Sequence, residues 1–272
     1  MSLLGKHLCK YYFYSLLFGV SFFVQASEPI KVTIVADDSY PPYSYLENEE
    51  IKGIYVDIIK AAAKRIAKYY QIEIITMPWK RGLVSLENSE HFAIIPPYKR
   101  KAKRPYIWPY STALFLETVV AFCHKDVSLE DAINSKGSQQ VIQVGMNAGF
   151  LILNKELKTA QAQGLIRIWE NKNTSANIMK LIFRRIDCYI NDRVSTLWQL
   201  TELQKQHAEV DFSNIQETYL VMEQTAHIGY VREGIAKYPY KADFIKKMDD
   251  ALLEIQKIGI SNNIINKYLS HH

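Results

Sequence analysis

Short apolar runs alternate with stretches of helical spacing from Ile30 to the end of the chain. The stretch Gly53–Tyr69 carries apolar residues three or four positions apart, as one face of an amphipathic helix requires. Apolar runs of strand length flank it, and this alternation is typical of an α/β fold. The predicted strands of this first unit are Lys31–Ala36, Ile72–Met77 and Phe92–Ile95, followed by a longer strand, Ala113–Cys123, with the acid Glu117 near its middle.

The same alternation continues through the rest of the chain. Its predicted strands are Val141–Gly145, Leu165–Trp169, Asp187–Asn191 and Ala226–Arg232, and its predicted helices are Phe150–Ala162, Ser175–Arg184, Asp192–Lys205, Tyr240–Ile258 and Ser261–Tyr268. Ser261 and Asn262 suit the N-cap of the last helix. Two α/β units joined by two extended crossings predict two lobes, each a mostly parallel sheet flanked by helices, with a cleft between them where small ligands bind.

The first 26 residues have the layout of a cleavable secretory signal. Lys6, His7 and Lys10 form a basic start, an apolar centre follows, and Val24-Gln25-Ala26 supplies a cleavage site. The apolar centre is shorter than the roughly 20 residues of a membrane-spanning helix, and the sequence contains no second such run. We therefore predict a signal peptide at 1–26, cleavage after Ala26 and export.

Charge and cysteine content add little about partners. The chain has 33 basic and 28 acidic residues, and the basic residues are scattered except in Lys99–Arg104. Cys123 and Cys188 remain after the signal, and a pair in an oxidising compartment is more readily a disulfide than a metal site when no His/Cys ligand spacing accompanies it. We expect no cofactor, no metal and no nucleic-acid partner.

The stretch ADDSYPPYSY, residues 36–45, follows the first strand without a linker. Pro41 and Pro42 fix their own φ angles and push the preceding residues towards extended geometry, so this turn is stiff. It presents Tyr40 and Tyr43 at low entropic cost. The alternative is a surface turn whose aromatic rings fold back onto the core.

The order and spacing of several motifs resemble the bacterial extracellular solute-binding proteins of the polar-amino-acid family, over essentially the whole mature chain. The matching segments are ADDSYPPYSY, Gly53–Asp57, Met77–Trp79 with Leu83 and Leu86, Ala93–Ile95 with Arg104 and Tyr110-Ser111, Val144-Gly145 with Gly149, and Arg185–Asp192. The resemblance implies a periplasmic-binding-protein fold, with one lobe formed by residues 27–116 and 229–272 and the other by 117–228. In the sheet order of the family, Cys123 and Cys188 lie on neighbouring strands, which implies a disulfide.

The resemblance also implies a ligand site in the cleft. Tyr40, Tyr43 and Trp79 would form its aromatic walls, although core packing is the alternative for Trp79. Arg104 would bind a carboxylate bidentately, with Arg100 as the substitute. The remaining ligand-binding residues implied are Asp37 beneath the aromatic wall, Tyr98, Asn147 and Gly149 with backbone amides at a helix start, and Asp192 on the ammonium group. A helix cap alone would also explain Asp192, and the two roles are compatible because a carboxylate has two oxygens.

The sequence departs from the family at two places beside this site. Pro96, Pro97, Tyr98 and Lys99 stand where small and hydroxyl residues are usual, and Phe150 and Leu151 replace threonines. Hydroxyl donors to a ligand are therefore lost.

The function implied is that of a monomeric, non-catalytic periplasmic receptor. It would bind a small polar solute, an amino acid or a related carboxylate, for an inner-membrane ABC permease. One alternative is an exported enzyme resembling periplasmic dehydratases, with Asp37 and Asp38 as paired carboxylates, although His91, His124, His207 and His227 are dispersed. The other is a ligand-sensing partner of a signalling protein.

Overall fold

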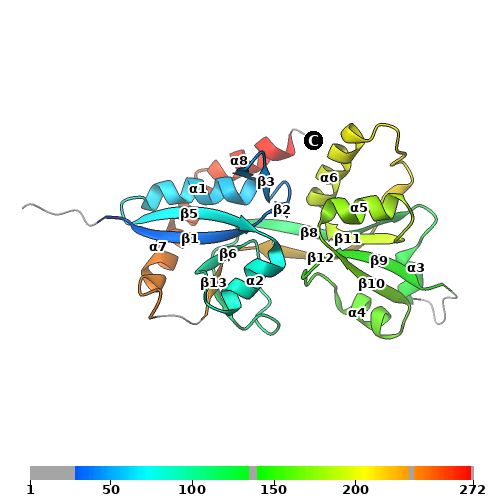
Figure 1. Ribbon diagram of the computed structural model, residues 1–272, viewed down its shortest axis with the longest axis horizontal. Coiled ribbons are helices and arrows are strands. Elements are labelled where there is room, and N and C mark those ends of the chain that lie inside the picture. Colours follow the sequence, from blue (N-terminus) through cyan, green and yellow to red (C-terminus); the bar gives the residue numbers. More distant parts are fainter. Residues whose placement is uncertain (1–27, 135–139, 233–235, 271–272) are drawn as a thin grey trace, which may run out of the picture.

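The computed structural model describes residues 28–134, 140–232 and 236–270. The expected signal peptide at 1–26 lies outside the described residues. Two five-stranded sheets, each covered by helices, form the two lobes seen at the two ends of the molecule in Figure 1. The expected two-lobed α/β architecture is therefore confirmed, whereas the lobe boundaries at 116/117 and 228/229 stay a prediction.

The first lobe contains the first sheet and both ends of the described chain. Its strand order is β5 (Tyr70–Met77), β1 (Ile30–Asp37), β6 (Ala93–Ile95), β13 (Gly229–Val231) and β7 (Ile107–Tyr110). Along β1, Ile34 and Ala36 pack on the same face as α1 (Ile54–Ile66) and α7 (Lys241–Lys257), whereas Val35 packs on the face of α2 (Trp79–Glu87). The last helix, α8 (Ile260–Leu269), packs on α1 and α7. The alternation of Ile34, Val35 and Ala36 between the two faces of β1 is the period-two pattern of a strand that is buried on both sides.

The second lobe repeats this layering. Its strand order is β10 (Ile166–Asn171), β9 (Ile142–Asn147), β11 (Cys188–Asp192), β8 (Phe115–His124) and β12 (Ile215–Ala226). Along β8, Val119, Ala121 and Cys123 pack on the side of α3 (Leu129–Asn134) and α4 (Lys155–Ala162). Val120 and Phe122 pack on the side of α5 (Thr174–Ile182) and α6 (Arg193–Gln206), as Figure 1 shows for the two helix layers.

In each sheet four of the five strands run in one direction and a single strand runs against them, so both sheets are mostly parallel, as expected. β1 runs parallel to β5 and β6, but β13 is antiparallel to β6 and β7. In the second sheet β9 is parallel to β10 and β11, but β8 is antiparallel to β11 and β12. The reversed strands are β8, which is itself the first crossing, and β13, which follows the second crossing, β12.

Three expected elements differ from the structure. The helix expected at Phe150–Ala162 begins only at Lys155, with Asn154 as its N-cap. The last helix follows Gly259, whose φ of 78° is left-handed, so the expected caps Ser261 and Asn262 lie inside the helix. The expected strand Ala226–Arg232 is divided between two strands: Ala226 ends the twelve-residue strand β12, and Gly229–Val231 forms β13. Polar residues make up half of the β12 sequence, IQETYLVMEQTA, and the sequence pattern did not reveal this strand.

A small hairpin sheet carries the tyrosine-rich turn. Its strands are β2 (Ser39–Tyr40), β3 (Ser44–Glu47) and β4 (Glu50–Lys52). Tyr43 lies in the turn between β2 and β3, and its ring is stacked on Tyr55 of α1 with centroids 4.9 Å apart. Both tyrosines of the turn are buried in the core of the first lobe, so their rings fold back onto the core, as the alternative for this turn predicted.

The two crossings lie side by side, because β8 pairs with β12 along its whole length, from His124 opposite Ile215 to Phe115 opposite Ala226. His227 fastens them: its Nδ1 lies 2.8 Å from the carbonyl oxygen of Ser111, and the Ser111 hydroxyl accepts the backbone N–H of Ile228. The connection between the lobes is therefore a paired, hydrogen-bonded ribbon.

A network of buried carboxylates and tyrosines joins the lobes beside this ribbon. Glu117 of β8 accepts hydrogen bonds from Tyr40 and Tyr98, both at 2.6 Å, and from Tyr55. Asp192 at the end of β11 accepts the Tyr43 hydroxyl at 2.8 Å, and also the backbone N–H groups of Thr118 and Ser195. We call Tyr40, Tyr43, Tyr55, Tyr98, Glu117 and Asp192 the hinge network. All four tyrosines belong to the first lobe.

Burial governs the ionisation of the hinge network. Removal from water raises the pKa of Glu117 to about 8, with a further increase from the nearby charge of Asp192, and the phenol donors offset only part of this. Burial likewise raises the pKa of Asp192 to about 6. Folding therefore favours the protonated form of Glu117 below about pH 8.

Cys123 and Cys188 face each other across the β8–β11 pair and are joined by a disulfide, with Cα atoms 4.1 Å apart. The bond lies in the buried core between β8 and α3. It closes a loop of 65 residues that contains most of the second lobe.

We predict that replacing both cysteines by alanine lowers the free energy of unfolding by about 4 kcal/mol, because a loop of this length is then free in the unfolded chain. Denaturant titration of the oxidised protein and the Cys123→Ala/Cys188→Ala variant measures this. Maleimide labelling of the oxidised, denatured protein is the control; labelling of both sites would contradict the pairing.

A second prediction concerns Glu117. Its pKa is raised from 4.5 to about 8 on folding, so its contribution to stability is complete below about pH 4.5 and is lost as the pH rises towards 8. The stability of the native protein relative to Glu117→Gln should therefore fall by about 1.4 kcal/mol per pH unit between pH 5 and 8.

Thermal unfolding of both proteins across this pH range measures the difference. Glu223→Gln, a change of an exposed glutamate on β12, is the matched control and should show a constant difference. A relative stability of the native protein that increases with pH would contradict the assignment.

Candidate functional site

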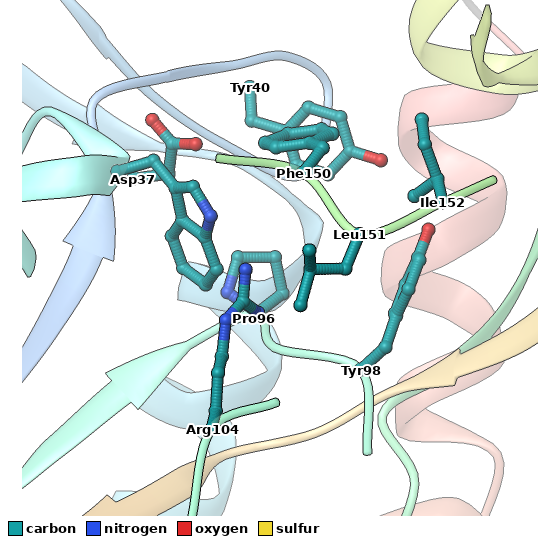
Figure 2. Close-up of a pocket in the computed structure, with 9 residues that line it drawn as sticks. Asp37, Tyr40, Pro96, Tyr98, Arg104, Phe150, Leu151 and Ile152 are labelled. Carbon is teal, nitrogen blue, oxygen red and sulfur yellow. The ribbon is translucent and has the colours of Figure 1, made fainter. Parts of the chain in front are cut away.

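A small cavity lies between the lobes, where the ends of β1 and β6 face the loop after β9. The first lobe contributes Asp37, Tyr40, Trp79, Pro96, Tyr98 and Arg104, and the second lobe contributes Phe150, Leu151 and Ile152 (Figure 2). Five of these nine residues, Asp37, Tyr40, Trp79, Tyr98 and Arg104, are among those expected from the sequence. The cavity lies at the carboxyl end of parallel strands, where α/β folds place ligands.

Arg104 enters the cavity from the loop between β6 and β7. Its residue is 5% exposed, and its Nη2 donates a 2.6 Å hydrogen bond to the carbonyl oxygen of Gly149 in the second lobe. The guanidinium also lies over the Trp79 ring, 5.4 Å from the centroid. Burial lowers the pKa of Arg104. Among the ion pairs of the described residues, none joins Arg104 to a carboxylate. A buried guanidinium thus meets a neutral carbonyl.

Asp37 ends β1 at the edge of the cavity. It is 6% exposed and accepts the backbone N–H of Ser39 at 3.1 Å. Burial raises its pKa to about 7 despite this hydrogen bond. Burial therefore favours the protonated form of this carboxyl group to a much higher pH than is usual for an aspartate.

Phe150 fills the space between the two aromatic walls. Its ring meets Tyr40 edge-on at 5.4 Å between centroids, and meets Trp79 edge-on at 6.3 Å. Figure 2 shows Phe150 in front of Tyr40, with Leu151 and Ile152 continuing across the cavity. The buried Nε1–H of Trp79 has no hydrogen-bond partner among the described residues. The cavity that remains measures about 30 Å³, which is room for about one water molecule.

Two of the expected ligand residues lie in the hinge network instead of the cavity lining. Tyr43 is fully buried and donates to Asp192. Asp192 is the N-cap of α6, accepting from the Ser195 N–H, so the helix-cap alternative is confirmed. In this conformation both Asp192 oxygens have donors within the chain.

The backbone amides after β9 do not lie at a helix start, because α4 begins only at Lys155. The N–H of Ala148 donates to Asn171, and the N–H of Phe150 donates to Asn147. The side chain of Asn147 is bonded to Thr174, Asn177 and Tyr189. Gly149, at a φ of 82°, directs its carbonyl oxygen to Arg104, so the segment offers an acceptor where donors were expected.

Sequence reasoning missed the role of the segment Gly149–Ile152, which we call the cleft segment. Residues 150–152 were assigned to a helix and Gly149 to the helix start, although the run GFLIL at 149–153 has no helical period. Arg100 was expected only as a substitute for Arg104, and Glu117 was noted only as an acid within a strand, because neither pattern says which distant residues these side chains contact. No metal-ligand cluster and no helix capable of spanning a membrane occur within residues 28–134, 140–232 and 236–270.

Several solved structures share this fold. The arginine-, lysine-, histidine-binding protein ArtJ from Geobacillus stearothermophilus superposes with a TM-score of 0.66 at 18% identity, covering 88% of this chain and 95% of that chain. A histidine kinase sensor domain with similarity to periplasmic binding proteins gives 0.70 at 14%, covering 89% and 97%. The ancestral amino acid-binding protein AncCDT-1, a precursor of cyclohexadienyl dehydratase, gives 0.64 at 14%, covering 88% and 94%.

At these identities the structures show the fold alone. A comparison with curated proteins gave no match. The model of the bacterial extracellular solute-binding proteins, family 3, matches residues 32–271, which is nearly all of the described chain. Together with the two-lobed fold and its interlobe cavity, this match shows that the chain belongs to the family 3 extracellular solute-binding proteins.

Proposed function

We propose that the protein is a periplasmic receptor for a small polar solute with a carboxylate group, an amino acid or a related acid, and delivers it to an inner-membrane ABC permease. The observation that carries this proposal is the buried guanidinium of Arg104, held in the interlobe cavity against a neutral carbonyl. A buried cation is costly unless it is paired, and a carboxylate would bind its donor fork bidentately. The family and the amino-acid-binding relatives support the same class of ligand.

The aromatic walls suit a solute with an apolar part beside its carboxylate. Tyr40 and Trp79 face the space that Phe150 now fills. The Trp79 Nε1–H, without a partner among the described residues, is a further donor for an oxygen of the solute. Trp79, Tyr40 and Arg104 thus offer apolar contact and hydrogen bonds in one place.

The solute needs more room than the structure leaves. Ligand pockets usually measure about 300–1,000 Å³, whereas the cavity measures about 30 Å³. Binding therefore requires the cleft segment to leave the aromatic walls, by parting of the lobes or by movement of the segment. A solute that binds only the rearranged state shifts the equilibrium towards it, and a permease would recognise that state.

Export rests on the family and on the signal-like N-terminal sequence. The alternative to transport is a sensory role, in which the protein binds the solute for a signalling protein; a histidine kinase sensor domain shares the fold. Both roles use the same binding event, and they differ only in the partner.

An enzyme of the dehydratase kind is the second candidate function. Asp37 favours it, because a cavity carboxyl with a pKa of about 7 is suited to general acid–base chemistry. The relative described as a precursor of cyclohexadienyl dehydratase shares the fold. Product analysis after incubation with each bound solute separates the two: unchanged solute supports the receptor, and loss of water from it supports the enzyme.

We predict that Arg104→Lys weakens solute binding roughly ten- to a hundredfold, or about 1.5 to 3 kcal/mol, because a single ammonium replaces a two-pronged donor. A thermal-shift screen of amino acids and short-chain carboxylates selects the probe, and calorimetric titration measures its affinity. Arg81→Lys, on the exposed face of α2, is the matched control and should bind as the native protein does. Equal affinity of Arg104→Lys and the native protein would contradict the proposal.

Removing the Phe150 ring should strengthen binding. The solute must displace this ring from Tyr40 and Trp79, which costs about 1.5 kcal/mol for a largely buried aromatic ring, so Phe150→Ala should bind the same probe roughly tenfold more tightly. Phe183→Ala is the control, since Phe183 is 56% exposed on the second lobe. Weaker binding by Phe150→Ala would mean that the ring is part of the ligand wall rather than its competitor.

A further inference from the structure

A second arginine holds the cleft segment from its other side. The Nε of Arg100 donates to the carbonyl oxygen of Leu151 at 3.0 Å, two residues after the carbonyl that Arg104 binds. Its Nη1 donates to the Gln224 side chain at 3.0 Å, and its Nη2 contacts the Met222 sulfur at 3.2 Å. The two arginines therefore clamp Gly149–Leu151 through two backbone oxygens.

The partners of this clamp are all neutral. Within the described residues neither guanidinium forms an ion pair with a carboxylate. Burial lowers the pKa of both, and the charge of Arg100 lowers that of Arg104 further. The two guanidinium groups repel each other and contact only neutral acceptors. Anionic oxygens at the positions of the Gly149 and Leu151 carbonyl oxygens would therefore form stronger hydrogen bonds with both of them.

The cleft segment keeps those two places near each other. A chain advances at most about 3.3 to 3.6 Å per residue, so the Cα atoms of residues 149 and 151 lie about 7 Å apart or less. Between them Phe150 places its ring against Tyr40 and Trp79. The segment thus presents two acceptor oxygens joined by an apolar body.

Space for a ligand exists on the Arg100 side. A groove of about 530 Å³ is lined by Arg100, Lys103 and Lys158, and it shares Phe150, Leu151 and Ile152 with the interlobe cavity. The acid on its wall, Glu170, is paired with Lys80 at 2.6 Å. The groove is therefore basic, and it shares a wall, the cleft segment, with the cavity that Arg104 lines.

The place expected for an ammonium group is already occupied by the protein. Asp192 accepts hydrogen bonds from Tyr43, Thr118 and Ser195. An ammonium group would have to displace a tyrosine of the hinge network to reach it. Asp37 is the carboxyl group among the residues that line the cavity, and burial raises its pKa to about 7, so in its protonated form it can lie beside an anion.

We propose that Arg100 forms a second anion subsite and that the solute is a dicarboxylate without an ammonium group, with one carboxylate on Arg104, the other on Arg100, and an apolar spacer against Tyr40 and Trp79. This inference rests on the proposed function and specifies its solute class. On binding, the solute takes over the two hydrogen-bonding positions of the Gly149 and Leu151 carbonyls. Arg100 and Arg104 then bind the two carboxylates of the solute instead of the two backbone carbonyls.

Calorimetric titration with straight-chain dicarboxylates of four to seven carbons, and with the monocarboxylates of equal length, tests this. The native protein should bind its preferred dicarboxylate at least tenfold more tightly than the matching monocarboxylate. Arg100→Gln should abolish this preference while keeping monocarboxylate binding, and Arg104→Gln should weaken both. Arg81→Gln is the surface control, and thermal unfolding verifies that each variant is folded.

If Arg100→Gln is unstable, Arg100→Lys keeps the charge with one point donor and should retain only part of the preference. Equal affinity for both acid series, or a preference that survives in Arg100→Gln, overturns the second subsite and leaves the receptor proposal standing. The same holds if an α-amino acid binds more tightly than every dicarboxylate. Absence of binding by amino acids, monocarboxylates and dicarboxylates alike overturns both.

Discussion

The hydrogen bond from Arg104 to the carbonyl of Gly149 is the contact on which the arrangement of the cleft depends. It joins a first-lobe loop to a second-lobe segment across the place where a solute would bind. A guanidinium buried this deeply must have acceptors, and the chain supplies them through its own backbone. The cleft segment therefore occupies the position of a ligand, with an oxygen on the arginine and a ring between the aromatic walls.

The hinge network connects the two lobes beside the cavity in which a solute would replace the cleft segment. Glu117 lies on the crossing strand β8 and accepts hydrogen bonds from three tyrosines of the first lobe, while Asp192 of the second lobe accepts one from a fourth. Tyr40 and Tyr98 belong both to this network and to the cavity lining. A solute that moves either ring thus acts directly on the hydrogen bonds that connect the lobes, and binding and lobe geometry are coupled through shared residues.

Most of the fold could be predicted from the sequence, because β1, β5 and α1 have regular apolar periods. The strand β12 escaped notice because one of its faces is polar and half exposed. At the site, Arg104 and Trp79 were expected from the family resemblance, through the spacing of Arg104 after β6 and the position of Trp79 just after β5. The cleft segment, the clamp of Arg100 and the engagement of Asp192 could not be predicted, since each depends on contacts between residues at least 40 positions apart.

The central claim is that a solute replaces the cleft segment on Arg104. A crystal structure of the protein with a bound carboxylate tests it most directly. We predict that the carboxylate contacts the Arg104 guanidinium, that the Gly149 carbonyl has left it, and that Phe150 no longer lies between Tyr40 and Trp79. A bound solute elsewhere, with the Arg104–Gly149 hydrogen bond and the Phe150 ring unchanged, would contradict the account.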